Sequence, residues 1–218
     1  MTLDFAVIWR SLPFLLDGLQ LSLLLTVAAM AGGITLGLVL AVVRLSRWRV
    51  AATFAAAYVN GFRAVPLVLV IFWFYFLVPL ALGHSVDALH SALIAFTLFE
   101  AAYYSEIIRA GLQSVRPGQW QAASSSGLGQ MQALRLVILP QAFRNMLPLM
   151  VSQAVILFQD TSLVYVISLR DFMTSASIVA TRDNRMVEIY LFAAVVYFVI
   201  CAIGSRTASI LNRQRRHA

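Results

Sequence analysis

Residues 13–43 read PFLLDGLQLSLLLTVAAMAGGITLGLVLAVV, and Asp17 is their only charged residue. A helix needs about 20 consecutive apolar residues to cross a hydrocarbon core of about 30 Å. This stretch is therefore long enough to span a bilayer, with residues to spare for a tilt or for a turn in the interface. It also continues far beyond the apolar part of a cleavable signal peptide, so we expect it to remain as a span.

Outward from this stretch, the chain contains four more segments of similar character. Of the 218 residues, 61% are hydrophobic and 11% are charged, whereas soluble domains carry about 25% charged residues. We expect an all-α polytopic membrane protein with five transmembrane helices, built as one domain over residues 1–218. The four further spans are expected at residues 52–78, 91–111, 146–169 and 187–211.

Two of the five segments contain residues that predict a local structural feature. Gly33 and Gly37 in the first have the four-residue spacing of small residues that lets two membrane helices approach closely. The second is interrupted by Arg63-Ala64-Val65-Pro66. Proline removes a backbone donor and clashes with the preceding turn, so we expect a kink or a break there.

The arginines predict the orientation. All 16 basic residues are arginines. With the loop after the first span inside, eleven arginines fall on the inner side, and Arg10, Arg170, Arg182 and Arg185 fall on the outer side, while Arg63 lies in a span. Loops rich in basic residues stay in the cytoplasm. The distribution predicts an N-terminus outside the cell and a C-terminus in the cytoplasm, which an odd number of spans also requires.

The basic composition does not indicate nucleic-acid binding. The net charge is +7, but the arginines lie between apolar segments, and they form no stripe alternating with exposed aromatic residues. The absence of lysine excludes a phosphate-binding loop of the G-x-x-x-x-G-K-[ST] type. If ATP drives this protein, another chain must bind it.

The region of residues 113–145 is too polar to span and too regular for a flexible linker. Residues 119–126 predict a short helix with a face of small residues, after which Gly127 and Gly129 supply a turn. Helical character resumes at residues 132–137, and Pro140 precedes the next span. A structured cytoplasmic loop of this kind predicts a docking surface.

This loop carries a family resemblance. Gln121-Ala122-Ala123, then Gly127, then Leu139-Pro140 have the spacing of the EAA loop of ABC importer permeases. Gln121 replaces the family's glutamate, and Val137 replaces its isoleucine, so a role for that carboxylate does not carry over. The resemblance implies a coupling helix that contacts an ATPase through this region; the implied residues are Gln121, Ala122, Ala123, Gly127, Leu139 and Pro140.

The resemblance covers nearly the whole chain. FRAVPLVLVIFWFYFLVP (62–79), FEAAYYSEIIRAGLQSV (99–115), LPQAFRNMLPLM (139–150) and FQDTSLVYVISL (158–169) are similar to the polar amino-acid permeases. Within that family, which includes histidine, glutamine and glutamate/aspartate permeases, they are most similar to the glutamate/aspartate subunits. The resemblance implies a type I ABC importer permease in the bacterial inner membrane. It also implies a second permease, identical or homologous, a periplasmic solute-binding protein, and a pair of ATP-binding subunits that hold the ATP and magnesium.

Four charged residues of the predicted spans are candidates for a functional role: Arg63, Glu100, Glu106 and Asp160. Such a residue at a helix centre costs about 2.5–3.5 kcal/mol. Arg109 lies three residues after Glu106, which predicts an intrahelical ion pair. Glu100 is expected to face either a partner helix or the substrate pathway.

Arg63 and Asp160 lie where their helices are expected to be interrupted, and broken helices line cavities in transporters. We expect Asp160, flanked by Thr161 and Ser162, to bind the substrate's ammonium group and Arg63 to offset the charge of an acidic substrate. The alternative is that the two residues pair with each other or across a subunit interface.

Two other classes of function agree less well with the sequence. A secondary transporter or channel acting alone is disfavoured by the odd number of spans, the structured loop and the lack of an inverted repeat. An intramembrane serine hydrolase lacks a suitable histidine, because His84 and His90 fall in an outer loop and His217 falls in the tail. We therefore expect a transport subunit that is not itself an enzyme and holds no metal or cofactor.

Overall fold

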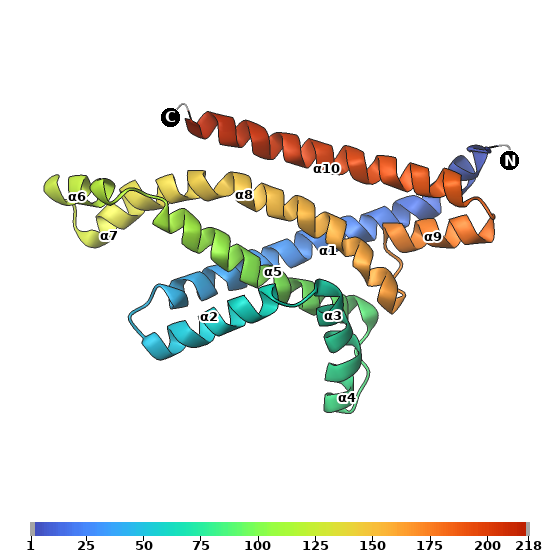
Figure 1. Ribbon diagram of the computed structural model, residues 1–218, viewed down its shortest axis with the longest axis horizontal. Helices are drawn as coiled ribbons and strands as arrows, with labels where there is room; N and C mark the ends of the chain where they lie inside the picture. The colour runs from blue at the N-terminus through green and yellow to red at the C-terminus, as the bar shows by residue number, and fades with distance from the viewer. Residues whose placement is uncertain (1–2, 217–218) are drawn as a thin grey trace.

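The computed structural model describes residues 3–216, with side chains for residues 3–213, and within these residues every regular element is a helix. Figure 1 shows a long bundle of α1, α5, α8, α9 and α10, with the other helices attached to it. The elements are α1 (Ala6–Arg44), α2 (Arg49–Arg63), α3 (Leu67–Phe72), η1 (Trp73–Leu77), α4 (Val78–Leu82), α5 (Ala88–Gln113), α6 (Pro117–Ser125), α7 (Gln130–Ala133), η2 (Leu134–Ile138), α8 (Leu139–Asp160), η3 (Thr161–Ile167), α9 (Phe172–Arg182) and α10 (Met186–Arg216).

Small residues let α1 and α5 lie in close contact. A Cβ added to Gly33 would lie 2.8 Å from the Cβ of Glu100, and one added to Gly37 would lie 2.9 Å from the carbonyl oxygen of Ala101. Cβ atoms essentially never come that close to another heavy atom. The predicted close approach at Gly33 and Gly37 is confirmed, and its partner is α5 of the same chain.

The predicted interruption of the second span is also confirmed. The helices before and after Pro66 meet at an angle of 106°. The α-helix resumes directly after Pro66, whose missing amide hydrogen falls at the break. Beyond the bend, α3, the π-helical turn η1 and α4 form an arm that leaves the bundle sideways (Figure 1). The arm ends at Gly83, whose φ of +74° suits a residue without a Cβ.

Among the residues that the structure describes, four helices are each long and apolar enough to cross a membrane, and the number is five when the bent pair of α2 with α3–α4 is counted as one span. The predicted five spans are thus confirmed by length and composition. One boundary was wrong: the span expected at residues 146–169 is part of a continuous helical rod over residues 130–167. Asp160 therefore lies near the far end of that rod, where α8 becomes the 3₁₀-helix η3, and not in the middle of a span.

Apolar side chains bury against each other in two main clusters. The first joins α1, α3, α5, α8 and η3 around Phe96, and the second joins α1, α9 and α10 around Phe172. Helix α9 lies between the last two predicted spans, where the sequence predicts no helix. It belongs to the second cluster because Ala176, Val179 and Ala180 of its inner face are fully buried. Its N-terminus is capped by the Asp171 side chain, which accepts from the amides of Met173 and Thr174.

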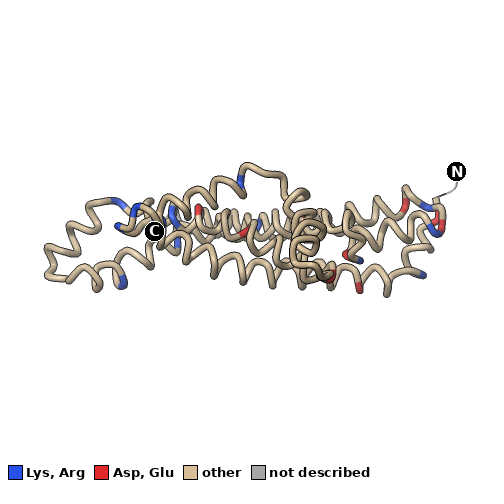
Figure 2. The backbone as a smooth tube through the Cα atoms, turned by 90° about the horizontal axis from the view of Figure 1, so that it is seen from below, with Lys and Arg blue, Asp and Glu red and all other residues tan. Residues whose placement is uncertain are grey.

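Charges gather at the two ends of the bundle. Figure 2 shows arginines toward the end that holds the C-terminus, charges of both signs at the end near the N-terminus, and few charges between. This separation is the one expected when the middle of the bundle lies in hydrocarbon.

Candidate translocation and coupling sites

Glu106 of α5 is surrounded by three arginines from three helices. Arg44 Nη1 of α1 donates to its carboxylate over 2.7 Å, and Arg109 donates to both of its oxygens. Arg63, at the end of α2, lies 4.0 Å from the same carboxylate, and its guanidinium lies over the ring of Tyr103 at 5.5 Å. The predicted Glu106–Arg109 pair is confirmed. The contact of Arg44 with Glu106 could not be predicted from local sequence, because 62 residues separate the two.

The structure does not bring Arg63 and Asp160 together. Arg63 contacts Glu106 and Tyr103 instead, so the alternative of an Arg63–Asp160 pair within one chain is wrong for the residues described. Asp160 is half-buried and makes no side-chain hydrogen bond or ion pair with any other described residue.

The hydroxyl groups beside Asp160 have different surroundings. Thr161 is fully buried and donates to the carbonyl oxygen of Phe158 over 2.8 Å, so its hydroxyl closes the end of α8. Ser162 donates to the carbonyl oxygen of Gln159 over 2.8 Å and also lines a cavity. Of the two, only Ser162 presents its side chain to an open space.

That cavity has a volume of about 820 Å³ and lies between η3, α9 and α10. Its polar lining residues include Ser162, Ser168, Arg170, Thr174 and Ser177. Tyr197 contributes a hydroxyl that is buried without a hydrogen-bond partner in the described chain. The Arg170 guanidinium can donate to a carboxylate, and the hydroxyl groups can donate or accept, while Met173 and Ile178 add apolar surface to the same cavity.

Glu100 is held inside the chain and away from this cavity. It is fully buried, and its two oxygens accept from Nε2 of Gln153 in α8 over 3.1 and 3.2 Å. Of the two predicted roles, the geometry favours contact with a partner helix. Gln153 was missed because a single amide within an apolar segment gives no signal of its partner.

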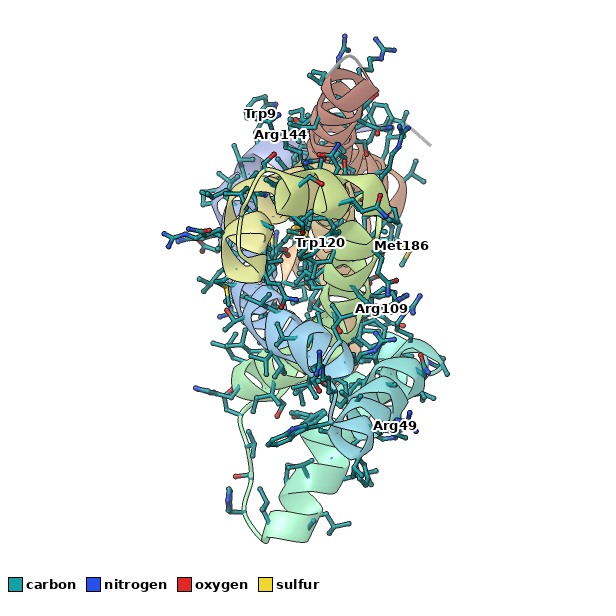
Figure 3. All side chains as sticks on the ribbon, turned by 90° about the vertical axis from the view of Figure 1, so that its left-hand side faces the viewer. Trp9, Arg49, Arg109, Trp120, Arg144 and Met186 are labelled. Atoms are coloured by element: carbon teal, nitrogen blue, oxygen red, sulfur yellow. The ribbon has the colours of Figure 1, made fainter. Side chains whose placement is uncertain are left out.

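The loop of residues 113–145 folds into α6, α7 and η2 and lies against the ends of α5 and α8. Gln141 donates to Gln119 over 3.1 Å, and Asn145 donates to Ser114 over 2.7 Å. The predicted turn is confirmed at Gly127, whose φ is +78°. Figure 3 looks onto this end of the molecule and labels Trp120 of α6 near its middle.

The predicted coupling residues differ in exposure. Gln121, Ala122, Gly127, Leu139 and Pro140 are exposed. Ala123 is only 5% exposed and lies inside the loop, so its methyl group is not on the surface where the sequence reading expected it. The predicted contact of the exposed residues with an ATPase stays a prediction.

At the end of the bundle near the N-terminus, polar contacts join α1 to the residues between α9 and α10. Arg182 donates to Ser11 of α1 and pairs with Asp183 over 2.8 Å, and the Arg182 guanidinium lowers the pKa of the Asp183 carboxyl. Glu188 accepts from the amide of Asp4 over 3.0 Å and pairs with Arg185. These contacts hold the beginning of α1 against the turn between α9 and α10.

Comparison with known proteins places this architecture. Residues 33–217 match the family described as binding-protein-dependent transport system inner membrane component. The chain is 52% identical to the glutamate/aspartate import permease protein GltK of Escherichia coli O6:H1 over 218 residues, or 97% of each protein. It is 35% identical to the arginine transport system permease protein ArtQ of Bacillus subtilis, over 98% of each.

Two solved structures of ABC transporters have a similar fold. A crystal structure of an amino acid ABC transporter with histidines superimposes with a TM-score of 0.91 at 32% identity, covering 98% of this chain and 100% of that one. The MetNI methionine ABC transporter in an inward-facing conformation shares the fold, with a TM-score of 0.72 at 17% identity over 93% of this chain and 98% of that one. The chain therefore belongs to the inner membrane components of binding-protein-dependent transport systems, and within them to the permeases of amino-acid ABC importers.

Proposed function

We propose that this chain is the permease subunit through which an ABC importer carries glutamate and aspartate into the cytoplasm, with ATP hydrolysis on partner subunits supplying the energy. The observation that carries the proposal is the 52% identity with a glutamate/aspartate permease over 97% of both chains. Identity with the arginine permease is 35% over a similar length. Since the chain contains no lysine, the phosphate-binding lysine of an ATPase must come from a partner.

The intramembrane charges suit an acidic amino acid. Such a substrate carries one ammonium group and two carboxylates. Asp160 offers an acceptor without a partner in the described chain, and Arg63 offers a guanidinium that Glu106 holds only at 4.0 Å. Because the two residues lie on different helices and form no ion pair with each other, we assign them to different positions along the pathway, each facing a second permease.

The partners follow from the same assignment. The exposed residues of the cytoplasmic loop, Gln121, Ala122, Gly127, Leu139 and Pro140, would contact a pair of ATP-binding subunits. A second permease, identical or homologous, would complete the pathway, and a periplasmic solute-binding protein would deliver the substrate to the outer end.

Reconstitution in proteoliposomes tests the proposal. The chain is assembled with its second permease, its ATPase pair and its binding protein, and uptake of labelled glutamate, aspartate, glutamine and arginine is measured with ATP inside the vesicles. We expect uptake of glutamate and aspartate that requires both ATP and the binding protein. Uptake of arginine or glutamine instead would refute the substrate assignment. Uptake driven by a proton gradient without ATP would refute the importer mechanism.

A further inference from the structure

The turn between α1 and α2 and the start of α2 carry two arginines that no other described residue neutralises. Arg44 forms an ion pair with Glu106, but Arg47 and Arg49 make no ion pair or side-chain hydrogen bond with other described residues. Trp48 between them is 79% exposed. The sequence has no acidic residue between Asp17 and Asp87. Figure 3 shows Arg49 on α2 at the margin of the molecule.

An apolar stripe runs from this turn along the outer face of α2. Val50 and Phe54 are 73% and 74% exposed, and Ala57 and Gly61 continue the same face at helical spacing. The opposite face of α2 buries Ala55 and Val59. Nothing in the described chain covers the outer stripe.

The stripe leads into an apolar groove at the bend between α2 and α3. The groove has a volume of about 290 Å³ and is lined by Ala57, Tyr58, Gly61, Phe62, Val65 and Trp73. The hydroxyl of Tyr58 already donates to the carbonyl oxygen of Leu98 over 2.7 Å. A Cβ added to Gly61 would meet nothing within 4 Å, so the groove is open there. Its lining offers surface for hydrocarbon and little for a polar ligand.

We propose that this surface binds one anionic phospholipid, with its phosphate on Arg47 and Arg49 and an acyl chain along the outer stripe of α2 into the groove. The 15 residues of α2 extend about 22 Å, enough to follow an acyl chain through one leaflet of a core about 30 Å thick. Trp48 lies between the two arginines, and exposed indole rings favour the headgroup level of a membrane. The unpaired arginines select an anionic over a zwitterionic headgroup, because a basic residue near the membrane surface is attracted to anionic lipid.

Native mass spectrometry of the purified complete transporter tests the headgroup contact. The complex is titrated with phosphatidylglycerol or with phosphatidylcholine of the same chains. We expect preferential retention of phosphatidylglycerol, and about ten- to thirtyfold weaker retention in the double variant Arg47→Gln/Arg49→Gln. The matched control is Arg206→Gln/Arg213→Gln, which removes two exposed arginines from α10 and should leave retention unchanged. Equal retention of both lipids, or equal losses in both double variants, would overturn the proposal.

Two further variants test the acyl-chain path. Gly61→Leu fills the groove and should lower retention of phosphatidylglycerol while both arginines remain. Replacing Phe54 by the photoreactive analogue benzoylphenylalanine should yield a lipid adduct after illumination. A cross-link from this position to the second permease would show that a protein covers the stripe and would refute the lipid assignment.

Discussion

At the scale of single residues, Gly37 and Gly61 lie in helices of the same chain but have opposite surroundings. A Cβ at Gly37 would meet backbone atoms of Ala101 and Ser105 at 2.9 Å, whereas a Cβ at Gly61 would meet nothing within 4 Å. We expect Gly37→Ala to destabilise the protein by about 1–3 kcal/mol, because α1 and α5 must separate. Gly61→Ala should be neutral or stabilising by up to about 1 kcal/mol, because alanine favours the helix. Thermal unfolding in detergent compares the two, and equal destabilisation would contradict the close contact of α1 with α5.

Asp160 is the residue whose charge should matter most for transport. Asp160→Asn keeps the shape and removes the charge. Since no described residue pairs with Asp160, we expect the complex to assemble and to hydrolyse ATP at its basal rate. Glutamate uptake should fall by about ten- to a hundredfold, because a hydrogen bond to a charged group contributes about 1.5–3 kcal/mol. Uptake and complex assembly are both measured.

Two other results would assign Asp160 differently. Loss of assembly in Asp160→Asn would indicate an ion pair with the second permease, because an unpaired buried partner costs about 3–5 kcal/mol. Unchanged uptake and assembly would exclude both roles.

At the scale of elements, adjacent residues of α6 lie on an exposed face and on an internal face. Ala122 is exposed and Ala123 is buried. We expect Ala122→Asp to leave the loop folded but to lower substrate-stimulated ATP hydrolysis, because the new carboxylate would lie in the contact with the ATPase. Ala123→Asp should instead unfold the loop, because an unpaired charge would be buried. Limited proteolysis distinguishes the two. If neither variant lowers stimulated hydrolysis, α6 is not the coupling element.

The elements also show what the sequence could predict. Long apolar segments, the interruption before Pro66 and the turn at Gly127 are local properties, so the spans, the bend and the loop could be predicted. Other features depend on which helices meet, and contacts between distant residues leave no local pattern in the sequence. These features are the burial of Ala123, the Glu100–Gln153 contact and the Arg44–Glu106 pair. Helix α9 was missed because its short amphipathic sequence follows polar residues, and its buried face has meaning only against α1 and α10.

At the scale of the whole molecule, the arginine distribution predicts the orientation in the membrane. Arginines gather at the end of the bundle that holds the C-terminus (Figure 2). We expect the C-terminus in the cytoplasm and the N-terminus outside. A reporter that is active only in the cytoplasm should therefore work when fused to the C-terminus and fail when fused to the N-terminus. The reverse pattern would overturn this topology and with it the cytoplasmic position of α6.

The continuous rod of residues 130–167 has a mechanical consequence. Its 38 residues extend about 55 Å, from the start of α7 to the end of η3. Near its middle it packs against α5, for example where the side chain of Met146 lies against Gly111 and where Gln153 donates to Glu100. A rod held near its centre acts as a lever with two arms of similar length. If α5 is the fulcrum, a push on the arm that begins at α7 would swing the Asp160 end by a similar amount in the opposite direction, so one stroke would close one side of the bundle while opening the other.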